Sequence, residues 1–182
     1  EILFFWVARM IMAGYEFKGD APFSDVYLTG TVRDMDGKKM SKSLGNGIDP
    51  LEVVQLYGAD ALRYTVISSV GFGTDVYMDP KNLDATFGVG RNFSNKIWNA
   101  GRFALMNIGD EPVASVASVR ADLEVADRWI LSRLSAAAAD VTRNLDAFRF
   151  HEAAESCYHF FWGELADWYL ELVKPRMQAD AD

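Results

Sequence analysis

The chain is poor in cysteine and in positive charge, and each shortage excludes a class of structure or function. Its single cysteine, Cys157, excludes a disulfide within the chain and fits a reducing, cytoplasmic setting. Because Cys157 lies in an apolar helical stripe, we expect a buried structural thiol. The 18 Lys and Arg residues face 26 Asp and Glu residues, a net charge of −8. This balance argues against a general electrostatic nucleic-acid binder, although local basic patches are compatible with it.

The apolar start of the chain, residues 2–14, is too short and too interrupted to cross a membrane, and it lacks the order of a signal peptide. We therefore predict no membrane association. The chain begins without methionine and without a helix cap, so we expect an internal piece of a longer protein. Half of its residues are hydrophobic, which is enough for a sizeable core.

Capping residues and hydrophobic spacing predict the elements of the first half. Residues 2–14 favour a largely buried helix that ends at Gly14. Residues 25–33 alternate enough for a strand. Asp49 is a suitable N-cap for a helix that has Pro50 at its first position and ends near Tyr57. A second short helix is expected over residues 59–69, with Leu62, Val66 and Ser69 on one face, and a short extended piece near Val76-Tyr77.

The second half is predicted to be helical. Asp79-Pro80 repeats the cap-and-proline start and introduces a helical region to Asn107, broken or loosened near Gly88 and Gly90. Residues 109–121 read as a linker, and another helix is expected over residues 123–145. The last helix should run from residue 150 to 173 and end at Pro175. Its expected buried stripe is Phe150, Ala154, Cys157, Phe161, Leu165, Trp168 and Leu172.

These segments predict a mainly α chain in two parts. Residues 1–77 hold the strand and the short helices, and residues 78–182 form an antiparallel helical bundle.

Residues 38–46 read Lys-Lys-Met-Ser-Lys-Ser-Leu-Gly-Asn, between the predicted strand and the capped helix. Lysines with interleaved hydroxyls on such a loop can hold a polyphosphate, because ammonium groups neutralise it while hydroxyl and backbone N–H groups donate to its oxygens. Lysine suits a mobile phosphate clamp, being a compact charge on a flexible stem. The alternative is a solvated loop without such a role.

The word Lys39-Met40-Ser41-Lys42-Ser43 resembles the KMSKS loop of class I aminoacyl-tRNA synthetases, and its flanks match as well. Four more segments resemble the valyl group of that family, with Ala61 in place of the isoleucine of isoleucyl relatives: residues 57–63, 90–100, 126–134 and 161–171. Two positions depart from the pattern, Thr29 where histidine is frequent and Gly47 where valine is usual. An isoleucyl relative and a non-catalytic tRNA-binding module remain as alternatives.

The resemblance implies the end of a nucleotide-binding α/β catalytic domain, a connecting fold that contacts the tRNA stem, and part of a helical anticodon-binding domain. It implies an ATP-dependent valine–tRNA ligase, monomeric, with valine, its tRNA and ATP as partners, Mg²⁺ carried by the nucleotide and no metal held by this chain. The HIGH motif of the family is not found among these residues, since His151 and His159 lie in other contexts. We therefore expect the chain alone to be inactive.

The resemblance also assigns the residues of the site. Lys42 would contact the phosphates with support from Lys39, and Met40, Ser41 and Ser43 would complete the ATP-binding loop. Backbone groups of Gly30, Thr31 and Val32 would meet the adenine end.

Two further sets of residues are candidates for substrate contacts. Ile2 and Trp6 share a helix face and would line the valine pocket, unless they pack in an ordinary core. Five basic residues are candidate tRNA contacts, with pairing to surface acids as the alternative: Arg91, Lys96, Arg102, Arg128 and Arg133. The tryptophans of the second half are expected to pack in the core: Trp98, Trp129, Trp162 and Trp168.

Overall fold

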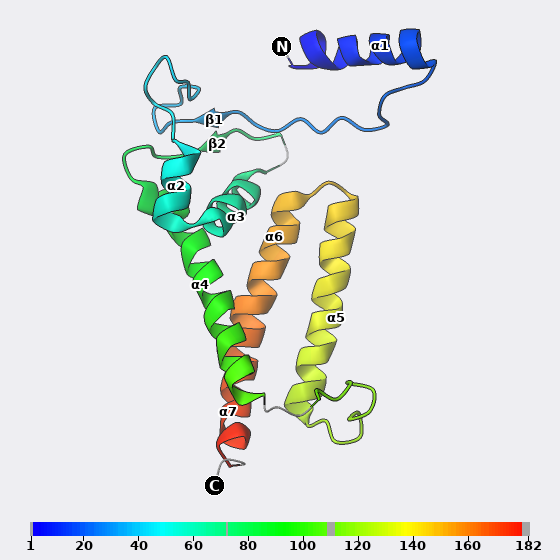
Figure 1. The fold of residues 1–182 in the computed structure, drawn as a ribbon, viewed down its shortest axis with the longest axis vertical. Coiled ribbons are helices and arrows are strands. Elements are labelled where there is room, and N and C mark those ends of the chain that lie inside the picture. The colour runs from blue at the N-terminus through cyan, green and yellow to red at the C-terminus, as the bar shows by residue number, and fades with distance from the viewer. Residues whose placement is uncertain (1, 72, 109–111, 180–182) are drawn as a thin grey trace.

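The computed structural model describes residues 2–71, 73–108 and 112–179, and within them it is mostly helical (Figure 1). The elements are η1 (Ile2–Val7), α1 (Ala8–Lys18), β1 (Val32–Arg33), α2 (Pro50–Tyr57), α3 (Ala59–Ser69), β2 (Val76–Tyr77), α4 (Leu83–Asn107), α5 (Val125–Asp146), α6 (Phe150–Tyr158), η2 (His159–Tyr169) and α7 (Leu170–Ala179). The two η segments are π-helical. Within the described ranges, none of the helices is both long and apolar enough to span a lipid bilayer.

A small core joins the sheet to α2 and α4, and Leu62 of α3 packs against it. β1 and β2 pair in parallel, with Val32 opposite Val76. Val76 packs with Met78, with Val53 of α2 and with Phe87 of α4. The strand predicted over residues 25–33 is therefore mostly wrong, because β2 offers only two residues to pair with and residues 25–31 run without a ladder partner.

The first helix is longer and far more exposed than predicted. It continues through Gly14 to Lys18 and ends at Gly19, whose positive φ of 75° closes the last turn. Figure 1 shows α1 set apart from the remaining helices. Val7 is its buried residue, whereas Phe4 and Phe17 are 79% and 81% exposed. Burial was predicted from composition, but the described part of the chain places little against this helix.

Local signals give the correct bounds for α2 and α3. The Asp49 carboxylate accepts a hydrogen bond from the Leu51 N–H at 2.9 Å, Pro50 opens α2, and Gly58 with a φ of 92° separates the two helices. The buried residues of α3 are Ala61 and Thr65, one position before the predicted Leu62–Val66 face. This shift arises because α3 packs closely on α4.

Helix α4 is continuous, contrary to the predicted break near its glycines. Asn82 caps it by accepting from the Ala85 N–H at 3.1 Å, so the helix begins at Leu83 and not at the Asp79-Pro80 signal. Gly88 and Gly90 are buried, and a Cβ atom at Gly90 would lie only 2.6 Å from the Ala61 carbonyl oxygen. Gly90 thus permits close contact between α3 and α4, which outweighs its poor helix propensity.

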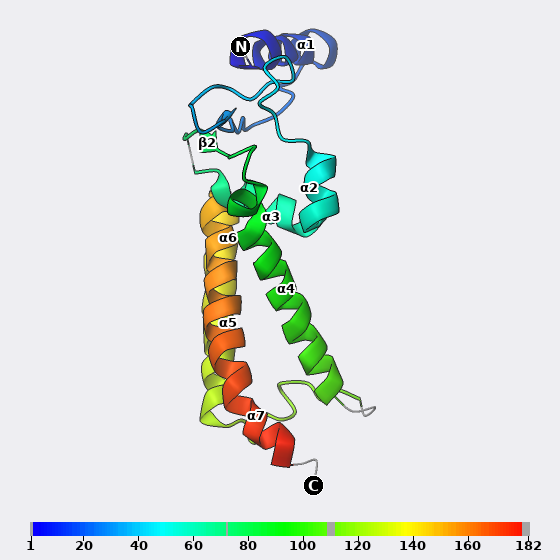
Figure 2. The ribbon, with the colours of Figure 1, turned by 90° about the vertical axis from the view of Figure 1, so that its left-hand side faces the viewer.

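Helices α4, α5 and the continuous α6–η2–α7 run along the long axis of the molecule (Figures 1 and 2). Helix α5 packs on α6 and η2, and α4 contacts η2. The helix predicted over residues 123–145 corresponds to α5. The division into domains 1–77 and 78–182 and the bundle assignment stay predictions.

The predicted end of the last helix is wrong, because Pro175 lies inside α7. The next residue, Arg176, is anchored to α5 and keeps the chain in helical geometry. The predicted stripe is also displaced. Ala153 is buried in α6. From η2 onward Ala166 and Val173 are buried and Trp168 is 65% exposed, since the wider π-helical turns of η2 carry more residues per turn and rotate the buried face.

Two other predictions of buried side chains are wrong, for Cys157 on α6 and Trp98 on α4. Cys157 is exposed, and the prediction of a buried residue is wrong. Enough protein still surrounds its sulfur that burial raises the pKa of the thiol. Trp98 of α4 is 72% exposed, like Trp168. Trp129 and Trp162 are partly buried, and the ring centroid of Trp162 lies 5.4 Å from that of Tyr158.

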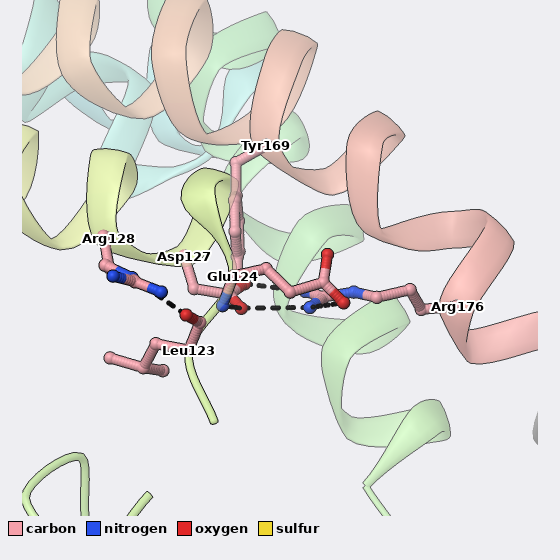
Figure 3. A network of polar contacts seen from close by, with 6 residues as sticks. All are labelled: Leu123, Glu124, Asp127, Arg128, Tyr169 and Arg176. Atoms are coloured by element: carbon pink, nitrogen blue, oxygen red, sulfur yellow. Dashed lines mark hydrogen bonds and ion pairs between the residues drawn. The ribbon is translucent and has the colours of Figure 1, made fainter. Parts of the chain in front are cut away.

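A buried carboxylate ties the start of α5 to η2 and α7 (Figure 3). Asp127 accepts from the Glu124 N–H at 2.9 Å, from the Tyr169 hydroxyl at 2.9 Å, and from both Arg176 Nη atoms at 3.0 and 2.6 Å. These donors, the Arg176 guanidinium foremost, lower the pKa of Asp127 to about 2. Residues 49 apart in the sequence are thereby held together.

Candidate functional site

The lysine loop, residues 38–46, returns along β1 after an acidic turn at residues 34–37, in which the Gly37 N–H donates to the Asp34 carbonyl. Arg33 and Lys39 form an isolated antiparallel bridge, and the Met40 N–H donates to the Val32 carbonyl at 3.0 Å. The Met40 side chain packs against the core cluster of Val53, Val76, Met78 and Phe87. The first part of the loop is therefore fixed to the core from two sides.

Asn46 closes the loop at its other end. Its Nδ2 donates to Asp34 Oδ2 at 2.7 Å and to the Lys39 carbonyl at 3.4 Å, while its Oδ1 accepts from the Ser41 N–H at 2.9 Å. One amide side chain thus holds Asp34, four positions before the loop, and two positions within the loop.

Asp34 is the partner of that amide and is only 8% exposed. Its Oδ1 accepts from the backbone N–H groups of Asp36 at 3.1 Å and Lys38 at 2.9 Å. The Asn46 amide, followed by the Lys38 N–H, holds the pKa of Asp34 below its usual value, because each donor favours the charged carboxylate. Asp34 therefore serves as an ionised acceptor.

A second set of contacts, made by Asp75, holds the chain just before the turn. Asp75, just before β2, accepts from Arg33 Nε at 2.5 Å and from the Thr31 N–H at 2.9 Å. Arg33 also donates to the Gly37 carbonyl at 3.0 Å. Arg33 and then the Thr31 N–H lower the pKa of Asp75, and the same contact raises the pKa of Arg33.

The two lysines stand at the exposed part of this braced loop. Lys42 is exposed and begins a turn in which the Gly45 N–H donates to its carbonyl at 3.2 Å. The Ser41 hydroxyl lies 3.2 Å from that of Ser43 and accepts from the Leu44 N–H at 3.3 Å. Lys39 is exposed as well. Ammonium groups on a braced but solvent-facing loop can neutralise a polyphosphate.

The backbone groups predicted to contact the adenine belong to residues 30–32, a few positions before the loop. A Cβ atom at Gly30 would lie 1.9 Å from the Thr74 carbonyl oxygen, so the structure explains this glycine by the neighbouring segment before β2. The Thr31 N–H already donates to Asp75. Of these three residues, Val32 bonds to the loop through the Met40 N–H, whereas Gly30 and Thr31 contact the segment at residues 74–76, and the contact of all three with adenine remains a prediction.

The two residues assigned to the valine pocket lie on η1, which is set apart from this loop. Ile2 and Trp6 are both more than half exposed. Their core alternative does not hold in the described chain, and the pocket assignment stays a prediction.

Most of the basic residues assigned to tRNA have acidic or backbone partners within the chain. Arg91 pairs with Asp84 at 2.8 Å, and Arg128 donates to the Leu123 carbonyl at 2.9 Å. Two further pairs cross between helices, Lys96 with Asp167 at 2.8 Å and Arg133 with Glu164 at 2.7 Å. Arg102 is exposed on α4. Pairing with an acid, the alternative, is thus observed for three of them, Arg91, Lys96 and Arg133, while contact with tRNA remains a prediction.

Three residues of the site were not identified from the sequence: Asp34, Asn46 and Asp75. The flanks of the lysine loop contained the first two, but only the folded loop shows that they meet. Asp75 lies 42 residues from Arg33, and no sequence signal connects them. Among the described residues, no group of three or more His, Cys, Asp or Glu side chains could hold a metal ion.

Two family models match the chain. The model of tRNA synthetases class I (I, L, M and V) matches residues 1–79, and the model of the anticodon-binding domain of tRNA ligase matches residues 127–182. Similar curated proteins are the valine–tRNA ligases of Thermotoga maritima, 49% identical over 99% of this chain, and Prochlorococcus marinus, 50% identical over all of it. The chain spans about a fifth of the length of these relatives.

A solved structure gives the same answer for the fold. The chain matches the crystal structure of the ternary complex of Agrobacterium radiobacter K84 agnB2 LeuRS with tRNA and LeuAMS, with a TM-score of 0.62. The match covers 87% of this chain and 20% of that chain, at 23% sequence identity. At this identity the likeness supports the fold alone.

Proposed function

Because this chain belongs to the class I tRNA synthetase family, in its valine–tRNA ligase group, we propose that it is part of an ATP-dependent valine–tRNA ligase. In the proposed reaction the valine carboxylate attacks the α-phosphorus of ATP, the bond to the β-phosphate oxygen breaks, and pyrophosphate leaves. A hydroxyl of the terminal ribose of the tRNA then attacks the valyl carbonyl of the adenylate, the acyl–phosphate bond breaks, and AMP leaves. The relatives carry the valine name, so the isoleucyl alternative is not favoured.

The lysine loop supplies charge to the first step. Lys42 neutralises the phosphates as pyrophosphate departs, and Lys39 supports it from the start of the loop. The observation that carries this assignment is that Lys42 is exposed while its loop is fixed by Asp34, Asn46 and Met40. A charge held in place before the reaction stabilises a transition state without reorganisation.

The remaining partners follow from the other parts of the chain. Residues 127–182 would contribute to recognition of the valine-specific tRNA, in keeping with the anticodon-binding match. Ile2 and Trp6 would meet the valine side chain. The chain alone would lack activity, because no histidine motif of the HIGH type occurs among its residues.

Lys42→Ala tests the proposal in the full-length ligase that contains this segment. Valine-dependent pyrophosphate exchange should fall by about 100-fold or more, because a charge that acts in the transition state is lost. The dissociation constant for valine should stay the same. Lys18→Ala, which removes a lysine at the distant end of α1, is the matched control and should leave exchange unchanged. Equal losses in exchange and in valine binding would contradict the assignment.

A further inference from the structure

We propose that Asp34 and Asn46 are positioning residues, and that their carboxylate–amide pair holds the lysine loop in the conformation that presents Lys42 to the phosphates. The inference rests on the proposed function of that loop. It adds two side chains that need not touch any substrate.

The hydrogen bonds of Asn46 fit an amide and no smaller side chain. Position 46 needs a donor toward Asp34 Oδ2, at 2.7 Å, and an acceptor for the Ser41 N–H, at 2.9 Å. Only one orientation of the amide satisfies both contacts, since the reverse would set Oδ1 against the carboxylate and Nδ2 against an N–H group.

Position 34 has the complementary requirement, for acceptors only. The carboxylate is buried and receives two backbone N–H groups as well as the Asn46 amide. Leaving such a buried group without its partner costs more than the bond itself contributes. The pair is therefore matched in charge and in donor pattern.

The Asp34–Asn46 pair lies where it can fix the conformation of the loop around Lys42. Met40 anchors one part of the loop to the core, and Asn46 fixes the other end to Asp34, four positions before the loop. Lys42 lies between these two anchors. Loss of the second anchor would free the chain around Lys42, and a displacement of about 1 Å can cost about 100-fold in rate.

The reciprocal exchange of the two side chains gives a sharp test. Asn46→Asp sets two carboxylates against each other, and Asp34→Asn leaves one amide N–H group facing another donor in either orientation. The double variant Asp34→Asn/Asn46→Asp restores a complementary pair: the amide at 34 accepts the two backbone N–H groups and donates to the carboxylate at 46, which accepts from Ser41. Only the long contact with the Lys39 carbonyl, at 3.4 Å, is lost.

Two measurements on the full-length ligase separate the position of the loop from its chemistry. The first is the rate of trypsin cleavage after Lys39 and Lys42 without substrates, followed by mass spectrometry, because cleavage reports local opening. The second is the kcat and KM of valine-dependent pyrophosphate exchange. Asp36→Asn is the matched control, since it removes a neighbouring exposed carboxylate and keeps its backbone N–H.

We expect each single variant to be cleaved about tenfold faster at the loop and to lose about 10- to 100-fold in kcat, with KM for valine unchanged. The double variant should return to within about threefold of the wild type in both measurements. Asp36→Asn should match the wild type.

The outcomes distinguish this inference from the proposed function. A double variant as impaired as the singles, or single variants with wild-type kcat, would overturn the positioning role while Lys42→Ala still tests the reaction. Wild-type exchange in Lys42→Ala would instead overturn the role of the lysine, and the positioning role with it.

Discussion

Asp127 is a single carboxylate whose contacts reach three helical segments (Figure 3). Its pKa in the folded chain, about 2, lies below the unfolded value of 3.8. A lowered carboxylate pKa stabilises the fold fully above the unfolded value, and the contribution is lost as the pH falls through the folded value. The carboxylate should therefore matter at neutral pH and lose its effect between about pH 4 and pH 2.

The prediction is measured by urea unfolding of the 182-residue chain from pH 7 to pH 2. The free energy of unfolding of the wild type should decline by about 2 kcal/mol more than that of Asp127→Asn over this range. Asp140→Asn is the control, because its pair with Arg143 is exposed and should contribute little. A parallel pH dependence in Asp127→Asn and the wild type would contradict the prediction.

At the scale of single residues, the sequence identified charged groups better than their partners. Lys39 and Lys42 lie in a sequence motif that can be recognised without a structure. Asn46 and Asp34 were visible only as flanks, because their role depends on closure of a loop between them. The hydrogen bond between them forms only when the loop folds back and brings residues 12 apart together. The types of the two residues do not predict that contact.

At the scale of elements, the contact between α3 and α4 depends on Gly90. A Cβ atom there would lie 2.6 Å from the Ala61 carbonyl oxygen and 2.7 Å from Thr65 Oγ1. Gly90→Ala should lower the free energy of unfolding by about 1–3 kcal/mol, because the two backbones must separate. This loss opposes the gain of about 1 kcal/mol that alanine brings to a helix.

Gly101→Ala is the matched control in the same helix. Its Cβ atom would have no neighbour within 4 Å among the described residues, so it should stabilise the chain by about 0.5–1 kcal/mol. Thermal unfolding of both variants measures the difference. A stabilised Gly90→Ala chain would show that α3 and α4 are free to separate.

The elements also show which signals can be read locally. Asp49, Pro50 and Gly58 act within their own helix, and the predicted bounds of α2 are confirmed. Gly90 and Pro175 failed as breakers, because contacts with α3 and α5 outweigh their local preference. The displaced stripe of η2 has a different origin, since π-helical turns are not visible in a pattern that assumes an α-helical period.

At the scale of the whole molecule, η1 and α1 present an apolar face that the described chain does not cover. Phe4 and Phe17 are among the most exposed of its large side chains. An apolar patch of this kind favours association in water. We therefore expect the 182-residue chain to self-associate with rising concentration.

Analytical ultracentrifugation of Phe4→Lys/Phe17→Lys tests this expectation. The variant should remain smaller than the wild type at the same concentration, because charge opposes burial of the face. Leu51→Lys, at an exposed apolar position on α2, is the control and should behave like the wild type. Equal association of all three chains would place the contact elsewhere.

Position 30 tolerates almost no amino acid other than glycine. Every other amino acid carries a Cβ atom, and at this position that atom would lie 1.9 Å from the Thr74 carbonyl oxygen. No gradual series of neutral replacements leads away from glycine unless the segment before β2 moves first. An ancestor that acquired this crossing of backbones would therefore have constrained position 30 in its descendants, whereas exposed positions such as residues 112–118 carry no such steric constraint.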